Sequence, residues 1–216
     1  MVKIKICGIT RLSDALEASH AGADALGFNF SSMSPRVITP EHAKVIIEKI
    51  PPFVQAAGIF VEQSVEEIKT ICRYCNLQIA QLHSERYCPE DACAINEARV
   101  IKVFRPEEDF EVQRVLEYAK KSGTNSFLFD AYRAGILGGT GETIKSSLAS
   151  HIFNQLGYSF YTILAGGLNE TNVAEAIRNV RPYAVDTASG VETEPGIKDV
   201  NKIKAFIHAV RKESLK

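Results

Sequence analysis

Asp130 stands at the end of a short apolar segment and shortly before a cluster of glycines. The apolar segment runs from Asn125 to Phe129, and Gly138, Gly139 and Gly141 follow Asp130 by eight to eleven residues. A buried strand that ends in a carboxylate places a proton donor beside the N–H groups of the next loop. Glycine lets the backbone approach an anion closely and direct these N–H groups at it. The segment therefore predicts a general acid next to a phosphate site.

Two later apolar segments also end in glycine. Each is an ordinary turn signal by itself, but their recurrence in consecutive loops favours one shared anion site. The expected phosphate-binding residues are Gly139, Gly141, Gly166, Gly167, Ser189 and Gly190.

Three further side chains stand where strands are expected to end. Cys7 is either a buried structural cysteine or, beside positive charge, a reactive thiolate that pairs with Asp130. Arg36 follows Ser34 and Pro35 in a loop; it is either a solvated surface residue or a bidentate ligand for a carboxylate. His83 is more typical of a structural histidine than of a base. Asp130 itself can also be a simple loop cap.

The chain alternates between strand and helix patterns. Apolar runs rich in β-branched residues occur at 3–6, 24–28, 54–60, 78–82, 99–104, 125–130, 159–165 and 183–187. Amphipathic periods are visible at 12–18, 65–71, 110–121, 171–180 and 200–210. Helix starts are indicated at Ser13 and Asp14, Thr39-Pro40-Glu41, Ser64 with Glu67, Asn169 and Asp199.

This alternation predicts an α/β fold, a (β/α)8 TIM barrel, with residues 1–216 forming one domain. An open doubly wound sheet is the alternative, but it carries its glycine fingerprint after the first strand. Here the glycines come late, where barrels commonly bind phosphate, and active-site residues are expected at the carboxyl ends of the strands.

Composition narrows the function classes. The 216 residues are 45% hydrophobic and 24% charged, with a net charge of −1. We therefore expect a cytoplasmic protein without nucleic-acid or membrane partners. The N-terminal residues are too few and too charged for a signal peptide. Five cysteines argue against a disulfide framework.

Four of the cysteines imitate a zinc ribbon. Cys72 and Cys75 are followed by Cys88 and Cys93. A strand separates the two pairs, and in a barrel it would hold them roughly 15–20 Å apart. No metal is expected.

Several motifs, taken together, resemble the phosphoribosylanthranilate isomerase family over residues 3 to about 210. They are Lys5-Ile6-Cys7-Gly8-Ile9-Thr10, Gly27-Phe28 with Ser34-Pro35-Arg36, Gly58-Ile59-Phe60-Val61, Gln81-Leu82-His83, Asp130 with Gly138-Gly139-Thr140-Gly141, Leu164-Ala165-Gly166-Gly167-Leu168 with Asn172-Val173, and Ser189-Gly190-Val191-Glu192 with Pro195-Gly196-Ile197-Lys198-Asp199.

The resemblance implies a cofactor-free Amadori rearrangement of a phosphorylated small-molecule substrate in tryptophan biosynthesis, by a monomer or a homodimer. Asp130 matches the family's acid, which opens the ribose ring. Cys7 matches the base that removes the C2 proton, and Arg36 matches the arginine that faces the anthranilate carboxylate. His83 is included in the expected substrate site.

Three departures from the family pattern leave these residues untouched. Ser84 replaces a common glycine, Ala188 replaces a hydroxyl residue, and 142–147 replace a Phe-Asp-Trp-like segment. They bear on substrate affinity and on the packing of the sixth loop.

Besides a zinc or redox protein built on Cys72 and Cys75, two rival functions remain. The related isomerase of histidine biosynthesis resembles a duplicated half-barrel with an aspartate at the position of Cys7. The other rival is a catalytically silent barrel that binds phosphorylated sugars, although the intact set of Cys7, Arg36 and Asp130 argues against it.

Overall fold

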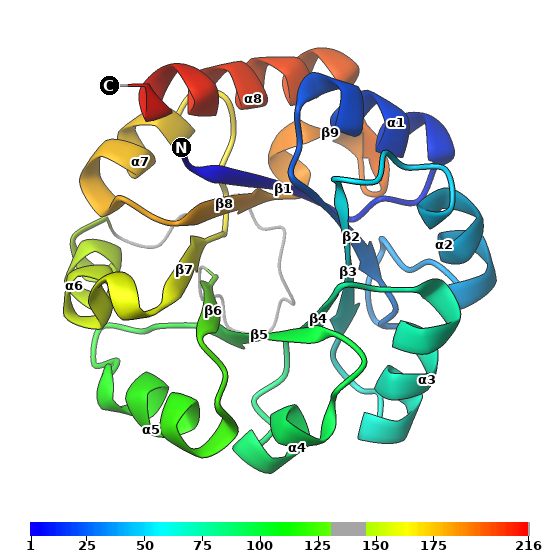
Figure 1. The fold of residues 1–216 in the computed structure, drawn as a ribbon. Coiled ribbons are helices and arrows are strands. Elements are labelled where there is room, and N and C mark those ends of the chain that lie inside the picture. The colour runs from blue at the N-terminus through cyan, green and yellow to red at the C-terminus, as the bar shows by residue number, and fades with distance from the viewer. Residues whose placement is uncertain (131–145, 216) are drawn as a thin grey trace.

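The protein forms a closed barrel of eight parallel strands. The structure, a computed structural model, describes residues 1–130 and 146–215. Each strand pairs with the next in sequence, and β8 pairs with β1 to close the ring (Figure 1). The strands are β1 (Lys3–Cys7), β2 (Ala25–Asn29), β3 (Gln55–Phe60), β4 (Ile79–Leu82), β5 (Arg99–Phe104), β6 (Ser126–Phe129), β7 (Tyr161–Leu164) and β8 (Ala184–Thr187). The predicted barrel is confirmed.

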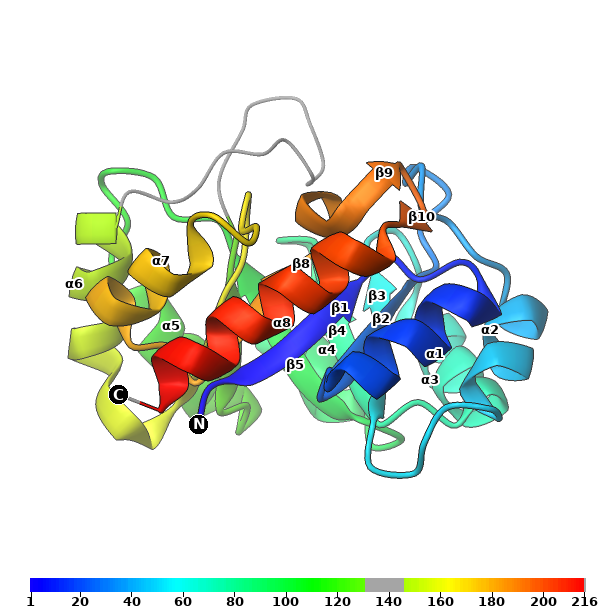
Figure 2. The ribbon, with the colours of Figure 1, turned by 90° about the horizontal axis from the view of Figure 1, so that it is seen from above.

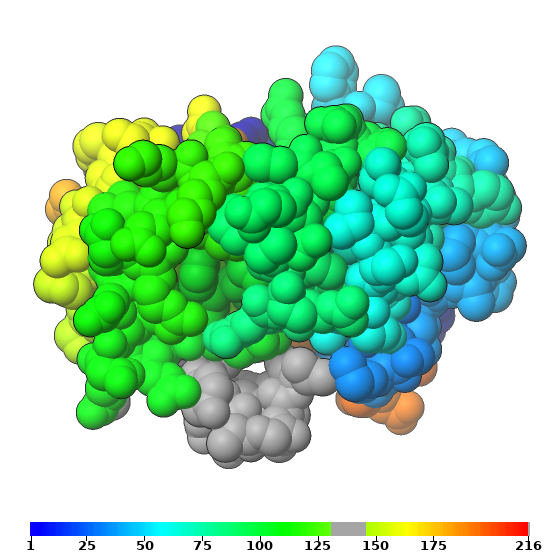
Figure 3. Space-filling view, turned by 90° about the horizontal axis from the view of Figure 1, so that it is seen from below, coloured from blue at the N-terminus to red at the C-terminus, as the bar shows by residue number. Residues whose placement is uncertain are grey.

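Helices surround the barrel. They are α1 (Leu12–Ala21), α2 (Pro40–Ile47), α3 (Val65–Cys75), α4 (Pro89–Ala94), α5 (Gln113–Ser122), α6 (Ser146–Leu156), α7 (Val173–Val180) and α8 (Val200–Ser214). Figure 3 shows α3, α4 and α5, coloured cyan to green, as a continuous outer wall. Two short 3₁₀ helices, η1 (Gly157–Ser159) and η2 (Ser189–Val191), and a hairpin of β9 (Glu192–Glu194) and β10 (Ile197–Lys198) complete the described elements. None of the helices in the described residues is long and apolar enough to cross a membrane.

Helix starts follow local capping chemistry. The Ser64 hydroxyl and the Glu67 carboxylate form a reciprocal capping box at α3, as predicted. The predicted caps at Thr39 and Asp199 are also confirmed, because their side chains accept from backbone N–H groups of the first turn. Helix α1 begins at Leu12, as the pattern at 12–18 predicts, but the start signal at Ser13 and Asp14 is wrong. Both residues lie in the first turn, where the Arg11 guanidinium binds Asp14.

Some predicted boundaries are too wide. Helix α5 begins at Gln113, three residues after the predicted start, and α7 begins at Val173, two residues late. Asn169 is not the N-cap of α7; its side chain closes a turn by accepting from the N–H groups of Thr171 and Asn172. Strand β7 begins at Tyr161 because η1 occupies the start of the predicted range.

The strands alternate between two environments. In β1, Ile4 and Ile6 are buried against the helices, whereas Lys5 and Cys7 face the interior of the barrel. A separate apolar cluster fills part of the interior. It consists of Ile101, Val103, Leu128, Ile163, Ala165 and Ala184. The polar residues of β1 and β8 therefore share the lumen with this apolar cluster.

An aromatic cluster supports β6 from outside. The ring of Phe104 lies 5.9 Å from that of Phe127 and 6.1 Å from that of Phe129, between centroids. Phe153 of α6 packs on Phe129 at 5.2 Å. Removal of one such buried ring typically costs about 3–5 kcal/mol. Because Phe129 directly precedes Asp130, this packing fixes the end of the strand from which Asp130 extends.

We predict that the two cysteines of α3 resist alkylation in the native protein. Burial raises the pKa of Cys72 to about 12 and that of Cys75 to about 11, so neither forms a thiolate at neutral pH. Cys88 and Cys93 are exposed and serve as internal controls. Iodoacetamide labelling at pH 8, read by mass spectrometry of the peptides, should modify the exposed pair first. Equal labelling of Cys72 and Cys93 would contradict the conclusion that burial keeps Cys72 protonated.

Candidate active site

A pocket opens at the carboxyl ends of the strands. Loops that follow seven of the eight strands contribute to its wall within the described residues. The lining residues are Cys7, Gly8, Asn29, Ser31, Met33, Ser34, Arg36, Ile59, Val61, His83, Asp130, Ala165, Gly166, Gly167, Asp186, Thr187, Ala188 and Ser189. Seven of the ten residues expected from the sequence thus share one cavity. This is the end of a barrel at which active sites are built.

Cys7 is surrounded by charged side chains. It ends β1, and the ammonium of Lys5, two residues earlier, lies 2.9 Å from Asp186 Oδ1 of β8. Burial raises the pKa of the Cys7 thiol, against the lowering effect of the Lys5 and Lys198 charges. Burial also acts to lower the pKa of Lys5, but Asp186 and Cys7 more than offset it, and the pKa of Lys5 is raised. Lys5 therefore stays charged beside the thiol.

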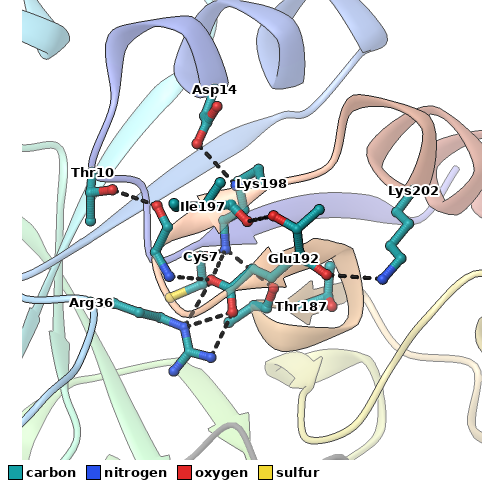
Figure 4. Close-up of polar contacts among 12 residues, drawn as sticks. Cys7, Thr10, Asp14, Arg36, Thr187, Glu192, Ile197, Lys198 and Lys202 are labelled. Atoms are coloured by element: carbon teal, nitrogen blue, oxygen red, sulfur yellow. Dashed lines mark hydrogen bonds and ion pairs between the residues drawn. The ribbon is translucent and has the colours of Figure 1, made fainter.

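Arg36 is held by a carboxylate. Its Nε and Nη2 donate to Glu192 at 2.9 and 2.7 Å, and both side chains are largely buried. Glu192 also accepts from Lys198 Nζ at 2.7 Å (Figure 4). One edge of the guanidinium is therefore already occupied. The other edge, which ends in Nη1, makes no hydrogen bond to a described residue and is the one available to a ligand.

Lys198 connects this network to Cys7. Its ammonium donates to the Cys7 carbonyl and, at 3.2 Å, to the Ala188 carbonyl. Burial lowers the pKa of Lys198, although the Glu192 carboxylate counteracts that effect. Burial likewise acts to raise the pKa of Glu192, but the hydrogen bond from Arg36 and the charge of Lys198 lower it. Figure 4 shows the Lys198 side chain, which extends from β10, beside Cys7 and Glu192.

His83 is fixed by Arg105. Arg105 Nη2 lies 2.6 Å from His83 Nδ1, and Nη1 donates to the His83 carbonyl at 3.1 Å. Burial and then the Arg105 charge lower the pKa of His83 well below its ordinary value. Because a guanidinium only donates, Nδ1 must accept, and the ring proton belongs on Nε2. His83 is thus a neutral hydrogen-bond donor that lines the pocket.

The loop after β7 has the form of an anion-binding turn. Gly166 and Gly167 have φ angles of 90° and 61°, which glycine adopts without strain. No described residue accepts a hydrogen bond from their N–H groups. Successive backbone N–H groups in such a turn form a concave site for an anion.

The loop after β8 approaches the loop after β7. A Cβ on Gly190 would lie 2.0 Å from the Leu168 carbonyl oxygen, and Thr187 donates to the same oxygen at 2.6 Å. Gly190 is therefore required for loop packing and does not line the pocket, whereas Ser189 does.

Asp130 is buried directly after β6, and its N–H donates to the Phe104 carbonyl at 3.0 Å. It lines the same pocket as Cys7. The predicted ligands Gly139 and Gly141 lie outside the described residues, as does the departure at 142–145.

The other two departures have visible contacts. The Ser84 carbonyl accepts from Lys102 Nζ at 2.6 Å, and its hydroxyl accepts from Arg86 N at 3.3 Å. Ala188 lines the pocket and lacks the hydroxyl that Thr187 and Ser189 keep on either side. Ser84 therefore shapes the loop after β4 without entering the pocket.

Sequence reasoning gave no role to the residues that hold the predicted ones in place. Lys5, Asp186, Glu192 and Lys198 are all buried and all belong to the charge network around Cys7. A signal existed for Lys5, because it shares a strand face with Cys7 at a spacing of two. Glu192 had only its place in the motif Ser189-Gly190-Val191-Glu192, which gave no hint that it meets Arg36 across 156 positions of sequence.

The four cysteines outside the pocket lie in two different environments. Cys72 and Cys75 are buried in α3, while Cys88 and Cys93 are exposed at α4. Among the described residues there is no group of three or more histidine, cysteine or acidic side chains that could hold a metal ion.

Comparison with known proteins gives a consistent answer. A family model described as N-(5'phosphoribosyl)anthranilate (PRA) isomerase matches residues 4–209. An N-(5'-phosphoribosyl)anthranilate isomerase of Pelodictyon phaeoclathratiforme is 74% identical over 98% of this chain and 99% of its own. One from Chlorobium phaeobacteroides is 70% identical over 97% and 98%.

A solved structure has the same fold along its whole length. The crystal structure of phosphoribosyl anthranilate isomerase from Thermotoga maritima superposes with a TM-score of 0.87 at 40% identity, covering 98% of this chain and 100% of that one. The family model, the relatives and the solved structure each match nearly the entire sequence. The chain therefore belongs to the N-(5'-phosphoribosyl)anthranilate isomerase family, whose members are enzymes of tryptophan biosynthesis.

Proposed function

We propose that the chain converts N-(5-phosphoribosyl)anthranilate to 1-(2-carboxyphenylamino)-1-deoxyribulose 5-phosphate by an Amadori rearrangement. The observation that carries the proposal is the convergence of Cys7, Asp130, Arg36 and the Gly166-Gly167 turn on one pocket. A related structure, 39% identical with a TM-score of 0.84, contains the reduced form of this product. It covers 98% of this chain and 100% of its own.

Ring opening needs an acid. Asp130 would protonate the ribose ring oxygen, so that the C1–O bond breaks and the anthranilate nitrogen takes up the positive charge as an iminium. A buried carboxyl at the pocket wall can transfer such a proton without competition from bulk water.

The second step needs a base. The Cys7 sulfur, as a thiolate, would remove the C2 proton, and the electron pair would move into the iminium to give an enolamine. Tautomerisation of the enolamine then gives the ketone. The proposal depends on the cations near Cys7, since burial alone keeps the thiol protonated.

Binding uses the two ends of the substrate. The free edge of Arg36 suits the anthranilate carboxylate, and the N–H groups of Gly166 and Gly167 suit the 5-phosphate together with Ser189. His83 offers an Nε2–H donor at the wall of the pocket. Remote contacts of this kind supply binding energy that positions the reacting carbons.

The rival isomerase of histidine biosynthesis gains no support. Its expected aspartate is replaced by Cys7, and the relatives at 74% and 70% identity are named for the anthranilate substrate. A dimer is named for the Thermotoga maritima neighbour. For this chain, monomer or homodimer stays a prediction.

The first test is turnover with and without the proposed base. Loss of phosphoribosylanthranilate fluorescence should be fast for the wild type and slower by a factor of roughly 10²–10⁴ for Cys7→Ala. Cys93→Ala, at an exposed cysteine, is the matched control and should behave as wild type. Fast loss in both variants would keep the substrate and discard Cys7. No loss with the wild type would reject the reaction itself.

Asp130→Asn should separate chemistry from binding. The amide keeps the shape of the side chain but cannot supply the proton for ring opening, so we expect kcat to fall by roughly 10²–10⁴. The Kd for the reduced product should stay close to the wild-type value. Both quantities are measurable, by fluorescence kinetics and by calorimetry. Turnover at the wild-type rate would eliminate Asp130 as the acid.

Arg36→Ala should mainly weaken binding of the anthranilate end. Loss of a charge-assisted hydrogen bond is worth about 1.5–3 kcal/mol, so KM should rise by roughly 10- to 100-fold. Arg73→Ala, an exposed arginine paired with Glu97, is the control. A substrate with aniline in place of anthranilate should show no added loss in Arg36→Ala. If the penalty is the same for both substrates, Arg36 acts through the fold and not through the carboxylate.

A further inference from the structure

The ion pairs around Cys7 carry an excess of positive charge. Lys5 pairs with Asp186, while Arg36 and Lys198 share the single carboxylate of Glu192. These contacts bring three cations and two carboxylates together in a largely buried cluster. Buried charges are normally compensated, so one further anion is favoured there. Cys7 is the ionisable group that the cluster surrounds.

Among these cations, Lys5 is placed to act on the Cys7 sulfur from the interior of the barrel. It precedes Cys7 by two residues on β1, and so both side chains extend from the same face of the strand. Cys7 and Asp186 line the pocket, whereas Lys5 does not line it and is almost fully buried. Its effect on the reaction must therefore pass through its neighbours and not through direct contact with a substrate.

The register of the barrel holds Lys5 in this position. Lys5 and Asp186 are direct partners in the ladder between β1 and β8, and the Lys5 ammonium donates to Asp186 Oδ1. Asp186 has two opposed effects: it anchors the ammonium, and its own negative charge disfavours a second anion nearby. Removing the two partners of this ion pair should therefore change Cys7 in opposite directions.

We propose that Lys5, anchored by Asp186, is a positioning residue that stabilises the thiolate of Cys7. The inference deepens the proposed function, because it rests on Cys7 as the base of the isomerisation. In the free enzyme, the Lys5 charge offsets part of the cost of ionising a buried sulfur. When Cys7 takes the C2 proton, it becomes neutral and Lys5 keeps its pairing with Asp186. The ion pair between Lys5 and Asp186 is therefore kept in both states.

The test measures ionisation of Cys7 without relying on turnover. The rate of iodoacetamide alkylation is followed against pH by mass spectrometry of the peptide that contains Cys7. Lys5→Met should move the midpoint to higher pH by about 1–3 units, the usual effect of losing an opposite charge nearby. Asp186→Asn should move it to lower pH. Lys5→Arg, which keeps the charge, should restore part of the change caused by Lys5→Met.

Lys3→Met is the matched control. Lys3 lies two residues before Lys5 on the same strand and pairs with Asp24, but it is half exposed and does not line the pocket. Its alkylation midpoint should equal that of the wild type. A merely structural role for the β1–β8 ion pair would instead shift Lys5→Met and Asp186→Asn in the same direction, and this result would overturn the proposal.

Kinetics provide a second readout. At neutral pH, kcat of Lys5→Met should fall about tenfold for each unit by which the Cys7 midpoint rises, with KM nearly unchanged. A midpoint equal to wild type in Lys5→Met would overturn the inference. If circular dichroism shows that Lys5→Met does not fold, the Asp186→Asn variant decides alone. An alkylation midpoint of Cys7 equal to wild type in Asp186→Asn would then overturn the inference. Failure of Cys7→Ala to reduce turnover would reject the base, yet leave the alkylation result standing.

Discussion

The barrel is closed by the pairing of β1 with β8, and the charges that surround the proposed base lie at this pairing. Main-chain hydrogen bonds place Lys5 opposite Asp186, and the resulting ion pair is buried in the lumen. Removing one partner of such a pair leaves an uncompensated buried charge and typically costs 3–5 kcal/mol. The two strands therefore have a fixed register in which their polar side chains must meet. This register also places the charged groups beside Cys7.

Glu192 extends the same constraint beyond the barrel. Its carboxylate accepts from Arg36 of the loop after β2 and from Lys198 of β10, while Lys198 also reaches the Cys7 carbonyl. Lys202 of α8 donates to the Glu192 carbonyl at 2.9 Å. A short hairpin thus joins the proposed carboxylate-binding arginine to the strand end that carries the proposed base. The hairpin lies at the carboxyl end of the barrel in Figure 2.

The elements were largely predictable from the sequence because their signals are local. Eight apolar runs and the caps at Thr39, Ser64 and Asp199 specify the order of strands and helices, and strand ends then point to Cys7, His83 and Asp130. The supporting network was not predictable by the same route. Glu192 sits in a three-residue strand and finds its partners through the tertiary fold. Lys5 interrupts an apolar run and looks like a solvent-facing residue until the strand is known to line a closed lumen.

The pairing of β1 with β8 also has a consequence for folding. Lys5 and Asp186 are 181 positions apart, and Lys198 and Cys7 are 191 apart. Contacts this distant in sequence form only after nearly the whole chain has been ordered, and contacts of high sequence separation slow folding. During synthesis, β1 emerges long before the residues that compensate its lysine. The surroundings of the proposed base are therefore assembled late, and they exist only in molecules that have completed the fold.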